Sequence, residues 1–314
     1  MQDKTPTPRK ITILGAGSIG LSFAAVFADS GAHVRLVDPD IARRAAADLE
    51  IAVHQAAIGA AGLTRGGAGV INVLDQAGTS IADADLILEC GPEDVTAKQA
   101  IFADILSHVS REAVVATASS AITISQIVPE PERQRRCLVA HPVNPPSVLR
   151  IIELVPAPGT DPDATKTASD VFRAVGFEAV QLGHEIEGFV LNRLQSAVLR
   201  EAYRLVDEGV TDAAGIDTVM RMGLGPRWAL SGPFETAELN TPGGIKAHAA
   251  RMGPAYKRIG EDRGETVDWN SDLVAKVDAQ RRSVLPAGAL PKRVAWRSSA
   301  VARLVAERDK LMQD

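Results

Sequence analysis

The segment Ile11-Thr-Ile-Leu-Gly15-Ala-Gly-Ser-Ile-Gly20 decides the fold of this chain. A short β-rich run ends in three glycines spaced G-x-G-x-x-G, and an alanine-rich segment of helical periodicity follows as far as Asp29. A second expected strand, residues 33–38, ends in an acid 18 residues beyond Gly20. The glycines alone are a weak signal, because glycine is common in turns. Strand, glycine turn, helix, strand and acid together are typical of a dinucleotide-binding fold.

Each glycine of this turn has its own physical reason. Gly15 permits a tight turn, Gly17 has no Cβ to block a pyrophosphate, and Gly20 lets the helix pack close to the sheet. The free N–H groups and the dipole at the start of the following helix favour an anion. The predicted cofactor contacts in this segment are Gly15, Gly17, Ser18, Ile19 and Gly20.

Asp38, at the end of the second strand, indicates which dinucleotide is bound. Its carboxylate can accept from both hydroxyls of a ribose and would repel a 2′-phosphate. Arg43 and Arg44 lie further along the chain and do not follow it directly. The sequence therefore predicts NAD rather than NADP. The alternative is a structural glycine turn in some other α/β fold.

Strands and helices continue to alternate after this unit. The pattern predicts helices over residues 41–58 and 93–109, a glycine-rich loop over 59–69, and strands over 70–74, 86–90, 113–118 and 137–140. Such alternation indicates an α/β fold with a mostly parallel, doubly wound sheet of Rossmann type. Ligands of these sheets bind at the carboxyl ends of the strands. The residues expected to share that edge are Gly15, Asp38, Glu89, Ser119 and His141.

Two short apolar runs, residues 137–140 and 151–155, predict buried strands around a turn that contains Pro142, Pro145 and Pro146. His141 stands where the first strand stops, and Glu153 lies inside the second. If the strands are neighbours, the carboxylate can reach the imidazole. An oriented histidine is what proton transfer near neutral pH requires. The alternative is an ordinary surface or core histidine at a strand end.

The chain changes character after Gly159. A helix over 162–175 and a last strand over 178–182 are followed from Glu187 by helical signals only. Thr211 and Asp212 are expected to cap a helix that runs to 222, and residues 223–233 to form a turn that carries Arg227. A final helix is expected over 290–312. We therefore predict an NAD-binding domain, residues 1–186, and an all-helical domain for substrate binding and dimerisation, residues 187–314.

Composition excludes several classes of protein. Apolar residues make up 46% and charged residues 23% of the 314, the net charge is −5 and the pI is about 5.8, which argues against a nucleic-acid-binding protein. Cys90 and Cys137 have no metal-ligand spacing, so no metal site is predicted, and they fit buried thiols in a reducing compartment. No run reaches the length of a membrane span, and residues 1–10 lack the hydrophobic core of a signal peptide. The protein is expected to be cytoplasmic.

The motifs taken together resemble the 3-hydroxyacyl-CoA dehydrogenase superfamily. The resemblance rests on the glycine turn, on His141-Pro-Val-Asn-Pro-Pro146 with Glu153, and on Gly188-Phe-Val-Leu-Asn-Arg193. Gly223-Leu-Gly-Pro-Arg227 and Gly232-Pro-Phe-Glu-Thr236 are most similar to the branch that contains L-gulonate 3-dehydrogenase and lambda-crystallin. The resemblance implies an NAD-dependent enzyme with a Rossmann domain, a helical domain and a homodimeric assembly.

The resemblance also implies roles for particular residues. His141 would be the general base that takes the proton of a substrate 3-hydroxyl, with Glu153 orienting it. Ser119 would hydrogen-bond the reacting oxygen, although Ala118 departs from the family pattern and leaves the choice between Ser119 and Ser120 open. Asn192 would bond the same oxygen from the other side. Glu93 and Lys98 match cofactor-contacting positions, or alternatively are a helix N-terminal acid and a solvated lysine.

The substrate depends on how its far end is held. Coenzyme A needs Lys or Arg to neutralise its phosphates, and residues 48–70 contain only Arg65 as a basic residue. Arg227 is instead expected to clamp a small carboxylate, its alternatives being a salt bridge or a stack on Trp228. The predicted substrate is therefore a small 3-hydroxy acid similar to L-gulonate. The alternatives are an L-3-hydroxyacyl-CoA and a crystallin-like structural protein that binds NAD without turnover.

Overall fold

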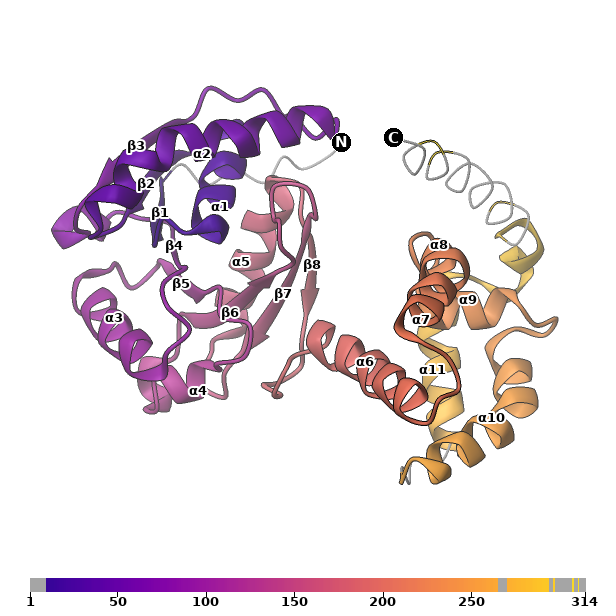
Figure 1. Ribbon diagram of the computed structural model, residues 1–314. Helices are drawn as coiled ribbons and strands as arrows, with labels where there is room; N and C mark the ends of the chain where they lie inside the picture. The colour runs from indigo at the N-terminus through magenta and orange to yellow at the C-terminus, as the bar shows by residue number, and fades with distance from the viewer. Residues whose placement is uncertain (1–9, 265–269, 294–295, 297–306, 308–309, 311–314) are drawn as a thin grey trace. The chain divides into compact units, whose positions relative to one another are not determined.

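The computed structural model describes residues 10–264, 270–293, 296, 307 and 310. It divides into two compact units, Met1–Val198 and Leu199–Asp314, and each is described by itself. The first is a sheet covered by helices, and the second is helical (Figure 1). Among the described residues, no helix is both long enough and apolar enough to span a membrane.

The first unit is built on one sheet of eight strands, in the order β3-β2-β1-β4-β5-β6-β7-β8. Strands β6 and β7 are antiparallel, and every other pair of neighbours is parallel. The predicted mostly parallel, doubly wound sheet is confirmed. The strands are β1 (Lys10–Leu14), β2 (His33–Val37), β3 (Val70–Leu74), β4 (Leu86–Glu89), β5 (Val114–Thr117), β6 (Cys137–Pro142), β7 (Ile151–Pro156) and β8 (Glu178–Gln181).

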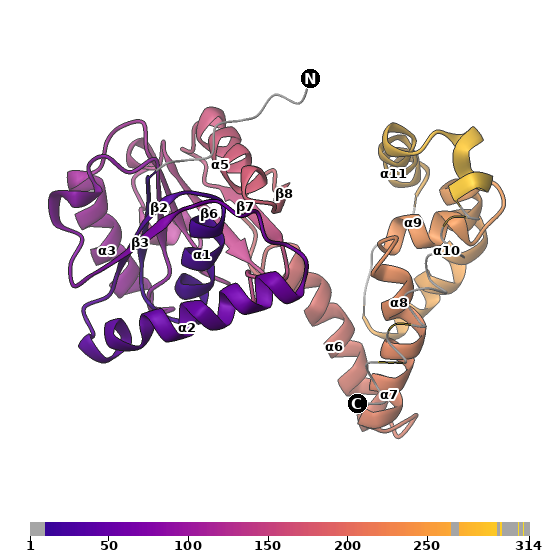
Figure 2. The ribbon, with the colours of Figure 1, turned by 90° about the horizontal axis from the view of Figure 1, so that it is seen from above.

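Helices cover both faces of this sheet (Figures 1 and 2). They are α1 (Ser18–Asp29), α2 (Ile41–Ala60), α3 (Val95–His108), α4 (Ile124–Ile127) and α5 (Pro162–Ala174). Strand β4 shows why both faces need cover, since all four of its residues are buried. Leu86 and Leu88 belong to the apolar cluster that contains α1 and α5, whereas Ile87 belongs to the cluster that contains α3 and α4. Side chains alternate along a strand, so a run of consecutive apolar residues fills two cores.

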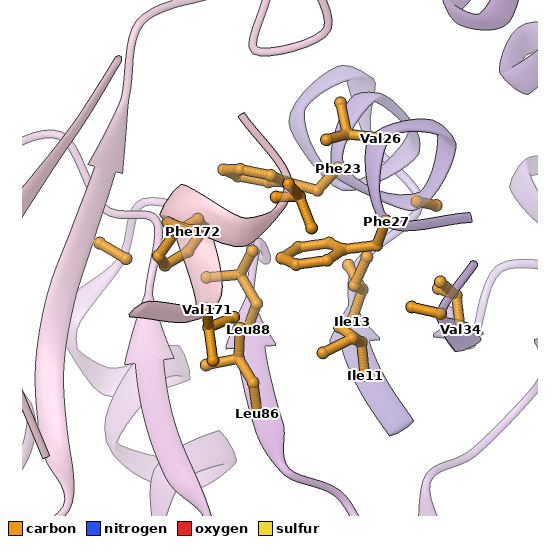
Figure 3. Close-up of a cluster of buried hydrophobic side chains, with 14 of the residues drawn as sticks. Ile11, Ile13, Phe23, Val26, Phe27, Val34, Leu86, Leu88, Val171 and Phe172 are labelled. Atoms are coloured by element: carbon orange, nitrogen blue, oxygen red, sulfur yellow. The ribbon is translucent and has the colours of Figure 1, made fainter. Parts of the chain in front are cut away.

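The larger core lies between the sheet and helices α1 and α5. Figure 3 shows Phe23 and Phe27 of α1 beside Phe172 of α5, above Ile11 and the other strand residues. The ring centroids of Phe23 and Phe27 each lie 6.0 Å from that of Phe172. This packing fixes α1 against the sheet and so fixes the glycine turn at its start.

The second unit is formed by helices that follow the sheet. They are α6 (Leu191–Asp207), which spans the division between the units, α7 (Ala213–Val219), a π-helix (Met220–Leu224), α8 (Gly225–Trp228), α9 (Pro233–Leu239), α10 (Gly244–Asp262) and α11 (Ser271–Val284). Asp212 caps α7 as expected, accepting from the N–H of Gly215 at 2.8 Å. The domain boundary at residues 186–187 stays a prediction.

The turn expected over residues 223–233 was wrong in its first half. The chain stays helical from Met220 to Trp228, first as the π-helix and then as α8. Pro226 lies in the first turn of α8, directly after the π-helix. Of the helix expected over 290–312, residues 294–295, 297–306, 308–309 and 311–312 lie outside the described residues.

Candidate active site

The glycine turn between β1 and α1 has the geometry that its spacing predicts. Gly15 has φ +111°, and a Cβ there would lie 2.6 Å from the carbonyl oxygen of Cys90. A Cβ on Gly20 would collide with the carbonyl oxygen of Gly15. Both positions therefore require glycine. Gly15 needs it for its backbone angle and for its contact with the segment after β4, and Gly20 needs it so that α1 can pack closely on the turn.

Space over Gly17 fits a diphosphate group. Gly17 is the N-cap of α1, no side chain caps the helix there, and α1 begins at Ser18. A Cβ on Gly17 would have one neighbour within 4 Å, the guanidinium of Arg43 at 3.6 Å. Uncapped N–H groups, the positive end of a helix dipole and a nearby cation together suit an anion.

Asp38 holds the glycine turn from the next strand. Its carboxylate is 5% exposed and accepts from the backbone N–H of Ala16 at 2.7 Å and of Asp40 at 2.9 Å. Arg44 donates to the backbone carbonyl of Asp38 at 2.8 Å. A carboxylate can accept more than two hydrogen bonds, so these contacts leave acceptor capacity for a ribose. The ribose contact itself stays a prediction.

His141 and Glu153 lie directly opposite each other in the antiparallel pair β6–β7. The imidazole Nδ1 lies 2.8 Å from Glu153 Oε2, and both residues are 4% exposed. The ring of Phe189 covers the imidazole, with 5.3 Å between ring centroids. The expected contact between the two side chains is present, and the ring nitrogen Nε2 is left to act on a bound molecule.

The second oxygen of Glu153 is bonded to the start of α6. Oε1 accepts from the N–H of Val190 at 2.9 Å and of Leu191 at 3.0 Å. The chain reaches this position through two left-handed residues, Gly188 with φ 75° and Phe189 with φ 50°. Burial by itself would raise the pKa of Glu153, but the hydrogen bonds from His141, Leu191 and Val190 outweigh it and lower the pKa below its usual value.

The two serines after β5 have different environments. Ser119 is 2% exposed, and its hydroxyl donates to Glu93 Oε1 at 2.5 Å and accepts from the N–H of Ile122 at 2.8 Å. Ser120 is exposed, and its carbonyl oxygen accepts from Asn192 Nδ2 at 2.9 Å. The structure therefore brings Asn192 to the turn of residues 119–121, called the serine turn below. Ser120 is the exposed serine of this turn.

Glu93 and Lys98 form a charged network with Glu89, in which Glu89 and Lys98 are buried and Glu93 is exposed. Lys98 is 1% exposed and its ammonium lies 3.0 and 2.8 Å from the two oxygens of Glu89 and 3.6 Å from Glu93. The alternative prediction of a solvated lysine was therefore wrong. Burial would raise the pKa of Glu93, and the hydrogen bond from Ser119 and the charge of Lys98 lower it overall.

Arg227 lies in the second unit, where it lines a cavity of about 500 Å³. The lining is mainly apolar and includes Leu224, Trp228, Phe234 and Tyr256. The carboxylate-binding role of Arg227 stays a prediction. In the part of the chain that the structure describes, no group of three or more His, Cys, Asp or Glu side chains is placed to hold a metal ion.

Sequence reasoning left two features of this site unassigned. It noted Arg43 only as lying beyond Asp38 and placed Glu89 only at a strand end. A signal for Arg43 was available, since α2 begins at the carboxyl end of β2, the edge at which such sheets bind their ligands. The environments of Glu89 and Ser119 depend on partners from other strands and helices, which local sequence does not contain.

Comparison with known proteins shows the family of the chain. Residues 10–186 match the family described as 3-hydroxyacyl-CoA dehydrogenase, NAD binding domain, and residues 188–284 match its C-terminal domain. Lambda-crystallin of Oryctolagus cuniculus is 33% identical over 308 residues, 96% of each chain. L-carnitine dehydrogenase of Bacillus cereus is 31% identical over 254 residues, covering 79% of this chain and 77% of that protein.

A solved structure is also similar. It is that of 5-formyl-3-hydroxy-2-methylpyridine 4-carboxylic acid 5-dehydrogenase, titled an NAD⁺-dependent dismutase, with a TM-score of 0.71 and 26% identity over 94% of this chain and 99% of that chain. The chain belongs to the 3-hydroxyacyl-CoA dehydrogenase family of NAD-binding oxidoreductases. Its cofactor is NAD. The glycine turn, with open space above Gly17, and the carboxylate of Asp38 fit this cofactor.

Proposed function

We propose that the protein is an NAD-dependent dehydrogenase that oxidises the 3-hydroxyl of a small free hydroxy acid, similar to L-gulonate, to the 3-keto acid. The observation that carries this proposal is the 2.8 Å contact between His141 Nδ1 and Glu153 Oε2. It lies at the carboxyl end of β6, on the same sheet edge as the glycine turn. A base oriented by a carboxylate beside a nicotinamide site suits alcohol oxidation.

The chain's own residues would move the proton and hold the reacting oxygen. With Nδ1–H donating to Glu153, Nε2 carries the lone pair that accepts the proton of the substrate hydroxyl. The carboxylate then stabilises the imidazolium that forms. NAD, when bound, supplies the acceptor for the hydride. Asn192 would bind the reacting oxygen from one side, and a serine hydroxyl would bind it from the other. Ser120 is favoured for this contact because it is exposed, whereas the hydroxyl of Ser119 is bonded to Glu93 and holds the turn.

Three observations support a free acid over a CoA thioester. L-carnitine is itself a free 3-hydroxy acid, and the pyridine substrate of the structural relative is a free carboxylic acid. Arg65, the basic residue of segment 48–70, lies at the far end of α1 from the glycine turn, where its backbone N–H donates to the carboxylate of Asp29 at 2.8 Å. Arg227 remains the proposed anchor for the substrate carboxylate, with its guanidinium suited to two parallel hydrogen bonds.

A direct comparison of substrates tests this proposal. NADH production is measured with L-gulonate, 3-hydroxybutyrate and 3-hydroxybutyryl-CoA at equal concentrations. We expect a free acid to give the highest kcat/KM. Arg227→Met should raise KM for that acid about tenfold or more, because a charged hydrogen-bonding partner is lost. A higher kcat/KM for the thioester would contradict the free-acid assignment and favour the acyl-CoA alternative.

A structural protein that binds NAD without turnover is the alternative from another class. Its support is the 33% identity with lambda-crystallin. NAD binding without oxidation of any acid in a broad panel would favour it. The homodimer implied by the family resemblance and the cytoplasmic location expected from the sequence both stay predictions.

Arg43 is proposed to contact the NAD diphosphate, because its guanidinium lies over Gly17. We expect Arg43→Ala to raise the Kd of NAD about three- to tenfold at low salt. The difference should shrink at 0.5 M salt, because salt screens exposed charges. Isothermal titration of NAD at both salt concentrations measures this, with the exposed Arg111→Ala as the matched control. An unchanged Kd at low salt would contradict the contact.

A further inference from the structure

Glu89 is a buried carboxylate that the proposed chemistry does not use. It ends β4, is 0% exposed, and accepts from the N–H of Gly91 at 2.6 Å, from Lys98 at 3.0 and 2.8 Å and from the hydroxyl of Thr117 at 2.6 Å. A buried ion pair is weak evidence for stability, since apolar residues of similar volume often serve as well. Its position at the ligand-binding edge of the sheet points to a different reason.

Two chains of contacts lead from Glu89 to the serine turn. In the first, Lys98 lies 3.6 Å from Glu93 Oε2, and Glu93 Oε1 accepts from Ser119 Oγ and from the N–H of Ser120 at 3.0 Å. The N–H of Ala121 also donates to Glu93 Oε1, at 3.2 Å. One cation therefore joins two carboxylates, and the outer carboxylate holds three successive residues of the turn.

The second chain of contacts runs through β5. Thr117 Oγ1 donates to Glu89 and accepts from the N–H of Ser119 at 3.2 Å. Glu89 thus reaches the turn from both ends, through the last residue of β5 and through Lys98 and Glu93. The carbonyl of Ser120 in turn receives Asn192 Nδ2. The turn also follows the strand beside β6, which ends in His141 and Pro142.

We infer that Glu89 is a positioning residue, which acts through Lys98, Glu93 and Thr117 to hold the 119–121 turn and Asn192 in the geometry needed for hydride transfer. This inference rests on the proposed function, since the turn and Asn192 are proposed there to bind the reacting oxygen. A fixed turn matters because a misplacement of about 1 Å can cost about a hundredfold in rate.

A charge-removal cycle separates positioning from stability. The variants are Glu89→Gln, Lys98→Met and the double variant, compared with wild type for Tm, kcat, KM and the Kd values of NAD and ADP-ribose. Lys98→Met leaves the buried Glu89 carboxylate without its cation, and Glu89→Gln leaves Lys98 only its 3.6 Å contact with Glu93, so each single variant should lower Tm. The double variant leaves neither charge, so its Tm should return close to that of wild type. We expect its kcat to stay about ten- to a hundredfold low, with ADP-ribose binding unchanged.

The matched control is Lys166→Met, which removes an exposed ion pair on α5 and should change none of these quantities. A double variant with restored Tm and kcat within about threefold of wild type would overturn the inference. If the double variant does not fold, Thr117→Val decides by the same kcat criterion, because it cuts the second chain of contacts without removing a charge.

The NAD and ADP-ribose measurements separate failure of this inference from failure of the proposed substrate. The ratio of the two Kd values reports how well the nicotinamide half is held, whichever acid is oxidised. We expect that ratio to rise at least about threefold in the double variant, because Glu93 has lost its cation. An unchanged ratio together with unchanged kcat would show that the pair has a structural role only.

Discussion

Replacing His141 with Asn is expected to lower kcat by about 10²- to 10⁴-fold while changing the Kd of NAD by less than about twofold. Asparagine can still hydrogen-bond Glu153, so the buried carboxylate keeps a partner and the strand pair β6–β7 keeps its register. The substituted amide has no basic nitrogen to accept the substrate proton. Initial rates of NADH production and titration of NAD measure the two quantities.

His108→Asn is the matched control, because His108 is a half-exposed histidine at the end of α3. It should leave kcat and NAD affinity unchanged. Retention of most activity in His141→Asn would remove the histidine from the proposed mechanism. Loss of NAD binding in that variant would show that the histidine holds the cofactor site rather than acting as the base.

Replacing Glu153 with Gln is expected to lower kcat by roughly 10³- to 10⁴-fold, as in catalytic triads where an orienting carboxylate becomes an amide. The glutamine oxygen would stay on the N–H groups of Val190 and Leu191, which leaves its NH₂ facing His141. The imidazole must then accept at Nδ1 and carry its proton on Nε2. That tautomer cannot take a proton from the substrate. Initial rates of NADH production measure the effect, and a titration of NAD checks that the variant binds the cofactor as wild type does. A kcat within about tenfold of wild type would contradict the orienting role.

The same variant predicts a pH dependence of stability. The pKa of Glu153 in the folded chain is lowered from 4.5, so its ionised form contributes stability fully above that pH. The contribution is lost as the pH falls through the lowered pKa. We therefore expect the Tm difference between wild type and Glu153→Gln to be constant near neutral pH and to narrow below about pH 4. A difference that widens on acidification would contradict this sign.

The fold could be predicted from the sequence because its strongest signals are local. The glycine spacing and the acid at Asp38 define one βαβ unit, and consecutive apolar residues such as those of β4 identify strands buried on both faces. The His141–Glu153 contact was also predictable, because two short strands around a proline-rich turn tend to pair. In an antiparallel pair, one register places these two side chains opposite each other.

The details of the serine turn could not be predicted in the same way. The partners of Glu89 lie 2, 9 and 28 residues away along the chain. Whether Lys98 is solvated or buried depends on how α3 packs on the sheet. The periodicity of the sequence predicts that this helix forms, but it does not predict which neighbours its side chains meet. The turn expected at 223–233 was wrong in its first half for a related reason, because glycine and proline only lower the local preference for helix, and tertiary context decides whether the helix breaks there.

Glu153 divides its two oxygens between the imidazole and the first residues of α6, and this has a practical consequence for refolding. A chain in which residues 188–191 have not yet formed their turn lacks two donors to this carboxylate. Its orienting group is then less firmly fixed, even where the sheet is complete. Where this turn forms after the sheet, regain of turnover should lag behind regain of NAD binding. The interval between recovery of NAD binding and recovery of turnover would measure how long the 188–191 turn takes to form on the completed sheet.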